Sequence, residues 1–341
     1  MKLRKIYLIH KYTGLCAGIF IFILVVSGSI LVFHDDLDQW QLKRYSQVEN
    51  TRPVSVDMGY RTVSAQYVDW DVRLIRFSER RDHALVFQLR KPEERLLAVV
   101  HPSNGALIKV IPQSQTLVYW VLKLHYTLLA GLVGEMLVLL SGLLFIISLL
   151  TGLIVYRKVL LKTLLFRVRF SFKTSNAFYS SLHRYVGVWS LLLNLLMGLS
   201  GVVISYEIVS AGLKKQEIPQ IALPEINISI DGVLKDIQLN VPDFKAEYIR
   251  FPLNSSQPMN IAGSYTRNSP FFSKYYNVIK VDINSGDYTD VSSTNNLSSL
   301  VRGIHFVEYG NGLIRVIFVL VGLSAGILTL SAYLIWVRRR K

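Results

Sequence analysis

Four of the seven histidines in this 341-residue chain recur at fixed offsets. The motif HKYTG that contains His10 recurs as HRYVG at His183, an offset of 173 residues. His125 and His305, each preceded by a branched aliphatic residue, are 180 residues apart. Imidazole binds metals and exchanges protons near neutral pH. The recurrence therefore predicts two sites, each built from one histidine of each half.

The histidines belong to a longer internal repeat. Ser27-Gly28 recurs as Ser200-Gly201 at the offset of 173, and Gly142-Leu143 recurs as Gly322-Leu323 at the offset of 180. The chain is thus predicted to hold two copies of one unit, a membrane span, an outer domain and a second span. Both copies begin and end on the same side, which predicts parallel repeats related by an axis along the membrane normal.

Hydropathy places the spans. The chain is 51% hydrophobic with a mean hydropathy of +0.35, and four apolar stretches reach the length of about 20 residues that a spanning helix needs. We predict transmembrane helices in 1–33, 132–156, 186–206 and 313–341, the last with a basic tail. The predicted domains are 34–131 and 207–312, each closing with a short helix that carries His125 or His305. A basic loop and helix start occupy 157–185.

Charge sets the orientation. Segments 1–11, 157–184 and 338–341 hold fifteen basic residues and no acidic residue, which equals the net charge of +15. Short loops rich in lysine and arginine stay in the cytoplasm, so both termini are predicted inside. Because this topology accounts for the positive charge, nucleic-acid binding is not expected. The first apolar run is longer than a signal-peptide core and lacks a small-residue cleavage site, which indicates an uncleaved anchor.

The outer segments show short alternating strands. They lie at 72–77, 84–89, 96–100, 248–251 and 276–281, with Gly-containing turns. The predicted fold is an all-α four-helix membrane core, made of two parallel span–domain–span repeats, with two extracytoplasmic α+β domains. The single cysteine, Cys16, excludes an intrachain disulfide, and the chain has no CxxCH motif for covalent haem attachment. We predict that Cys16 is a buried packing residue.

Two imidazoles facing each other inside a helix bundle provide the two axial ligands of a b-type haem. Gly14 and Gly187 follow His10 and His183 by four residues on the same helix face, which would leave room for a porphyrin. Basic residues that could pair with haem propionates lie within three positions of the four histidines: Lys11, Arg184, Lys123 and Arg302. We therefore predict two b-type haems, one with iron ligands His10 and His183 and one with His125 and His305.

Other interpretations of the histidines remain open. They could be interfacial side chains that bind backbone groups, or they could form a proton relay or a non-haem metal site. The last two are disfavoured because no Asp or Glu recurs beside the histidines. His34, His83 and His101 do not recur, and we expect them to be solvated or locally bonded. Asn194, inside the third span, predicts an interhelical hydrogen bond.

The four histidine segments resemble the PepSY-associated transmembrane proteins. The resemblance rests on HKYTG…SGSILVF, LHYTLLAGLVGEMLVLLSGLL, LHRYVG…SGVVISY and IHFVEYGNGLIRV, and it covers nearly the whole chain. It implies a bacterial inner-membrane protein with two periplasmic PepSY-like domains and a role in iron uptake. It also implies two b-type haems on His10, His183, His125 and His305, as in ferric-siderophore reductases.

Together these features predict a di-haem electron conduit surrounded by membrane lipid. It would take electrons from a cytoplasmic or quinol donor and reduce a ferric siderophore or another ferric chelate outside. The sequence shows no nicotinamide or flavin fingerprint. Aromatic residues near the outer histidines could line the acceptor site or anchor the interface: Tyr119, Trp120, Tyr126, Phe306 and Tyr309. The alternative is a non-enzymatic accessory protein that binds a peptidase, a transporter or a ligand.

Overall fold

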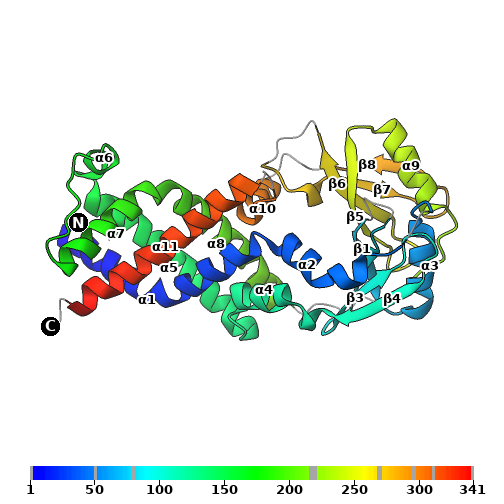
Figure 1. The fold of residues 1–341 in the computed structure, drawn as a ribbon, viewed down its shortest axis with the longest axis horizontal. Helices are drawn as coiled ribbons and strands as arrows, with labels where there is room; N and C mark the ends of the chain where they lie inside the picture. Colours follow the sequence, from blue (N-terminus) through cyan, green and yellow to red (C-terminus); the bar gives the residue numbers. More distant parts are fainter. Residues whose placement is uncertain are drawn as a thin grey trace. The chain divides into compact units, whose positions relative to one another are not determined.

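The structure, a computed structural model, describes residues 3–49, 52–77, 82–214, 221–266, 271–292, 297–308 and 312–338. The chain divides into two compact units (Figure 1). The first, here called the helical unit, comprises Met1–His34, Trp120–Gln216 and Ile304–Lys341. The second, the sheet unit, comprises Asp35–Tyr119 and Glu217–Gly303.

Four helices of the helical unit are long and apolar enough to cross a membrane. They are α1 (Leu3–Leu31), α5 (Gly131–Tyr156), α8 (Leu191–Leu213) and α11 (Gly312–Arg338). The prediction of four spans is therefore confirmed. Helix α1 packs against α5 and α11, α5 also packs against α8, and α11 packs against α7 (Ser175–Trp189). A small apolar cluster of Ala17, Ile21 and Ala325 lies between α1 and α11.

Shorter helices adjoin the spans. They are α4 (Leu117–Thr127), α6 (Leu160–Leu164), α7 and α10 (Leu297–Phe306). Between α4 and α5, Leu128, Leu129 and Gly131 all have positive φ, so the chain breaks sharply there. A Cβ on Gly134 would lie 1.6 Å from the Thr127 carbonyl oxygen, so only glycine permits this close return. Gly310 and Asn311, at the equivalent place before α11, lie outside the described residues.

The third span differs from the prediction. It was expected to be one helix over 186–206, but α7 ends at Trp189 and α8 begins at Leu191. The Ser190 hydroxyl donates to the Val186 carbonyl, and Ser190 itself leaves ideal helical geometry. His183 therefore lies on α7, a separate helix, whereas its counterpart His10 lies within the continuous α1. Helix α8 also continues to Leu213, beyond the predicted end of the span at residue 206.

The sheet unit contains a single eight-stranded antiparallel sheet in the order β4-β3-β2-β1-β5-β6-β7-β8. Its strands are β1 (Asp71–Arg76), β2 (Leu85–Arg90), β3 (Arg95–Val100), β4 (Leu107–Pro112), β5 (Phe244–Arg250), β6 (Met259–Tyr265), β7 (Val278–Val281) and β8 (Tyr288–Asp290). Two separate domains were expected. Instead the two outer segments join through β1 and β5, where Leu74 pairs with Ile249.

Helices cover the sheet from both sides. Helices α3 (Val56–Gln66) and α9 (Ile230–Asn240) pack on one face, over a core that includes Phe87, Ile249 and Phe251. On the opposite face, Leu42 of α2 (His34–Ser46) packs with Val86, Leu97 and Ile111. Short 3-10 turns lie at Gln113–Gln115 and Lys274–Tyr276.

The first turns of α3 and α9 cap each other. The Asp231 carboxylate accepts hydrogen bonds from the Ser55 hydroxyl (2.6 Å) and from the backbone N–H groups of Val56 (2.7 Å) and Asp57 (3.4 Å). Asp57 reciprocates with the Ser229 hydroxyl (2.8 Å) and two N–H groups of α9 (2.8 and 3.1 Å). Carboxylates at helix N-termini satisfy unpaired N–H groups and interact favourably with the helix dipole. This reciprocal cap ties the two outer segments together, and it was not predicted from the sequence.

Candidate functional site

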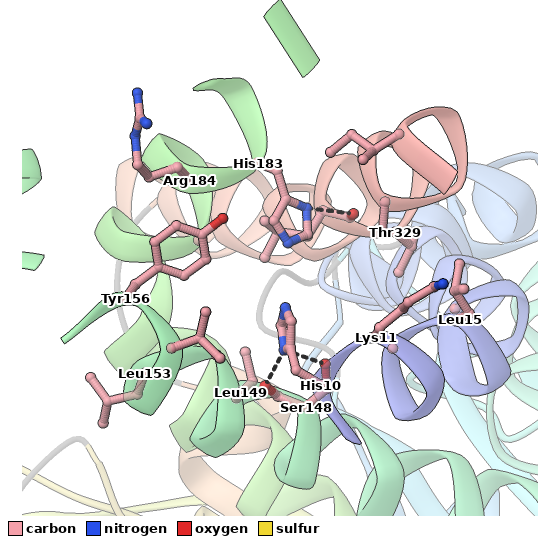
Figure 2. A pocket seen from close by; sticks show the side chains of 18 of the residues that line it. His10, Lys11, Leu15, Ser148, Leu149, Leu153, Tyr156, His183, Arg184 and Thr329 are labelled. Carbon is pink, nitrogen blue, oxygen red and sulfur yellow. Dashed lines mark hydrogen bonds between the residues drawn. The ribbon is translucent and has the colours of Figure 1, made fainter. Parts of the chain in front are cut away.

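The inner histidine pair lies between α1 and α7. The imidazole rings of His10 and His183 face each other with their centroids 6.1 Å apart and their planes at 67° (Figure 2). The outer pair joins α4 and α10, where the ring centroids of His125 and His305 are 6.3 Å apart at 40°. The structure thus brings together the same pairs that the sequence repeat indicated.

Each ring is fixed through its Nδ1 atom to the backbone of a neighbouring helix. The acceptors are the carbonyl oxygens of Ser148 for His10 (2.9 Å), Leu328 for His183 (3.1 Å) and Leu24 for His125 (3.0 Å), and the backbone of Met197 for His305. A carbonyl oxygen can only accept, so Nδ1 carries the proton. In the neutral imidazole, the lone pair is then on Nε2, where it can bind a metal.

Serine hydroxyls add to these contacts. Ser331 lies 3.0 Å from Nδ1 of His183, Ser27 lies 3.1 Å from that of His125, and Ser200 lies 3.0 Å from that of His305. Because each Nδ1–H is a donor, these hydroxyl oxygens accept. The Ser148 hydroxyl is 3.4 Å from Nδ1 of His10. Oriented partners of this kind fix the tautomer and the ring plane of metal-binding histidines.

Glycines allow three of the rings to pack directly against a helix backbone. A Cβ built on Gly152 would lie 3.0 Å from Cε1 of His10, one on Gly28 would lie 2.9 Å from Cε1 of His125, and one on Gly201 would lie 3.1 Å from Cε1 of His305. Gly14 and Gly187, which were predicted to leave room for a porphyrin, are not the glycines that meet the rings. A Cβ on those two would meet Ser148 Oγ at 3.0 Å and Leu328 Cδ2 at 3.4 Å. The repeated Ser27-Gly28 and Ser200-Gly201 pairs were the available sequence signal.

The ring separation fits an iron between each pair of imidazoles. A metal–nitrogen bond of about 2.0 Å, with about 1.1 Å from Nε2 to the ring centroid, gives about 6.2 Å between the centroids of two axial ligands. The observed 6.1 and 6.3 Å agree with that value. Among the described residues, no three or more His, Cys, Asp or Glu side chains gather as a metal site. Two-ligand coordination, as in a bis-histidine haem, suits this arrangement better than a non-haem metal.

A cavity of about 300 Å³ surrounds the inner pair (Figure 2). His10, His183, Lys11, Arg184, Gly14 and Gly187 all line it, together with apolar side chains of α1, α5 and α11. The Arg184 Nε atom is buried and has no hydrogen-bond partner, which leaves a donor for an anion such as a propionate. These residues therefore fit a haem.

The separation of the two histidine pairs across the membrane follows from their positions along α1. His10 lies on this helix, and His125 contacts it at Leu24, Ser27 and Gly28. Fourteen to eighteen residues at a rise of 1.5 Å correspond to about 21–27 Å along the helix axis. The hydrocarbon core of a bilayer is about 30 Å thick. The two pairs therefore lie near opposite ends of the span.

The remaining predicted residues vary in their surroundings. Lys123 lies over the Tyr126 ring (5.3 Å), Arg302 precedes His305 by three residues on α10, and Tyr309 lies outside the described residues. The local bonding expected for the other histidines is confirmed: His34 bonds the Leu31 carbonyl, His83 bonds Asp82, and His101 contacts Ser103. Asn194 donates across helices to the Ser324 hydroxyl (3.2 Å), as predicted. Cys16, predicted to be buried, is exposed on α1.

Four apolar helices and a large antiparallel sheet define a polytopic membrane protein with an extramembrane α+β part. The chain belongs to the PepSY-associated TM region family, whose profile matches residues 7–339. The resemblance found in the histidine motifs is thereby confirmed. No curated protein matches the chain.

Proposed function

We propose that this protein is a di-haem electron conduit of the bacterial inner membrane. It would accept electrons on the cytoplasmic side and reduce a ferric siderophore or another ferric chelate on the periplasmic side. In this proposal both termini are cytoplasmic, and the sheet unit lies in the periplasm. The fifteen basic residues of the two termini and the 157–184 loop support that orientation.

One observation carries the proposal: both histidine pairs have the spacing and the tautomer that axial haem ligands require. The backbone acceptors at each Nδ1 leave Nε2 free in every ring, and the centroid distances match a single iron in each pair. When bound, each haem would supply one-electron transfer. The chain itself orients the imidazoles, surrounds the inner pair with apolar side chains and offers Lys11 and Arg184 to anionic groups.

The first experiment measures haem directly. The purified protein should show a reduced bis-histidine b-type absorbance spectrum, and pyridine haemochrome quantification should give two haems per chain. A colourless protein that cannot be loaded with haem would instead support the alternative, a membrane-anchored accessory that binds a peptidase, a transporter or a ligand.

A second experiment tests the site of electron exit. The protein is reduced with dithionite, freed of excess reductant and mixed with a ferric siderophore. The wild type should be reoxidised. The variant His125→Ala should keep the inner haem but fail to be reoxidised, since its outer pair is incomplete. If it is reoxidised as fast as the wild type, the outer pair is not the exit.

A further inference from the structure

A polar row crosses six strands of the sheet on the face opposite α3 and α9. Each member pairs in register with the next one across the sheet, in the order Gln88, Arg73, Arg250, Asn260, Lys280 and Thr289. Residues directly opposite in register point to the same face. Their neighbours along the strands, such as Leu74, Ile249 and Ile261, belong to the core beneath α3 and α9. The row therefore lies on the other face.

Like charges lie opposite each other in this row and in the adjacent row, which consists of Asp71, Arg90 and Arg95. Arg73 pairs in register with Arg250 across the junction of the two segments, and Arg90 pairs with Arg95 between β2 and β3. Like charges directly opposite in a sheet are destabilising. The two rows hold five cations against the single carboxylate of Asp71. Three of the five cations, Arg95, Arg250 and Lys280, are exposed to solvent, and the excess of positive charge makes this surface attractive to an anion.

The cations differ in their partners. Arg73 is held by Asp71 (2.6 Å) and by the Tyr248 hydroxyl (2.9 Å), so its charge is balanced and its position fixed. Arg90 donates from Nε to the neutral Gln88 amide oxygen (2.5 Å), and the Asp71 carboxylate that attracts it is already bonded to Arg73. Burial and the nearby Arg73 lower the pKa of Arg90 to about 10, and they outweigh the attraction of Tyr248 and Asp71. Arg250 and Arg95 are exposed at the ends of their strands.

Aromatic rings border the same cations. Tyr248, which precedes Arg250 by two residues on β5, packs edge to face against Tyr275 with ring centroids 5.9 Å apart. Tyr275 is 49% exposed. Guanidinium groups bind carboxylate and catecholate oxygens through paired N–H donors, and tyrosine rings stack on flat apolar groups. The surface thus combines both kinds of contact.

We propose that this surface, made of Arg73, Arg90, Arg95, Arg250, Tyr248 and Tyr275, recognises a negatively charged metal chelate. The favoured ligands hold Fe(III) through catecholate or carboxylate groups and keep a net negative charge. Neutral hydroxamate chelates are disfavoured because they cannot compensate the arginines. The inference rests on the proposed function, since it names the substrate class of the same protein.

The test uses gallium complexes, because Ga(III) has the charge of Fe(III) but is not reduced. The full-length protein in detergent is titrated by calorimetry with gallium tris-catecholate and with a neutral gallium tris-hydroxamate. We expect the anionic complex to bind at least about tenfold more tightly, and its binding to weaken when salt rises from about 0.05 M to about 0.3 M. Arg90→Gln and Arg250→Gln should each weaken it by about tenfold. Arg61→Gln, an exposed arginine on α3 over the opposite face, should not.

Each result decides the proposal. Equal affinity for the neutral complex, the absence of any binding, or wild-type affinity in both arginine variants would overturn it. The comparison of the two complexes and the salt series use the wild type, so a variant that fails to fold does not decide the outcome. Because gallium binding needs no haem, a chain that cannot be loaded with haem but binds the anionic complex would overturn the proposed electron conduit and leave this surface supported.

Discussion

Replacing Gly28 with alanine should remove the outer haem selectively. The new Cβ would lie 2.9 Å from Cε1 of His125, whereas carbon atoms in contact prefer about 3.5–4.0 Å. The imidazole must therefore move by about 0.6 Å or more. Ligand distances in metal sites tolerate only about 0.2 Å. Alanine is more favourable than glycine in a helix by about 1 kcal/mol, so the variant should fold. Only the outer haem should therefore be lost.

The assay is haem per chain and the reduced absorbance spectrum. We expect two haems in the wild type and one in Gly28→Ala, with the inner pair intact. Gly201→Ala should have a milder effect, because its Cβ would lie 3.1 Å from Cε1 of His305. Gly326→Ala is the matched control, since its Cβ would make an ordinary 3.4 Å contact with Val25. Two haems and an unchanged spectrum in Gly28→Ala would refute the reasoning.

Three further predictions address the pairing, the topology and the reciprocal cap. His10→Ala, His183→Ala and the double variant should each retain one haem, as measured by pyridine haemochrome; loss of both haems in the double variant would contradict the pairing. A reporter active only outside the cytoplasm should work when fused at Ser103 and be silent at the C-terminus, and the reverse pattern would invert the topology. Asp57→Ala removes three hydrogen bonds to the first turn of α9 and should destabilise the sheet unit by about 2–3 kcal/mol. Its thermal unfolding would be compared with that of Glu93→Ala, an exposed acidic control; equal midpoints would exclude a stabilising role for the cap.

The strands show where local patterns succeed. Strands β1, β2 and β3 lie within one residue of their predicted limits, because apolar and β-branched residues dominate them. Strand β6 was missed because Asn260, Gly263 and Ser264 interrupt its apolar pattern. The join of β1 to β5 could not be predicted either. It depends on which strand edges meet, and strand edges carry backbone groups that are the same in every sequence.

The sequence by itself determined the four spans and the two histidine pairs. Span length and hydropathy are local properties, and the repeat aligns equivalent histidines without any knowledge of packing. Only the tertiary structure decided how each ring is held. The Nδ1 acceptors are backbone carbonyls 101 to 145 residues away in the sequence, and every residue has such a carbonyl, so no side-chain pattern marks them. The same holds for the glycines against the rings, since Gly28, Gly152 and Gly201 matter through the helix that each one faces.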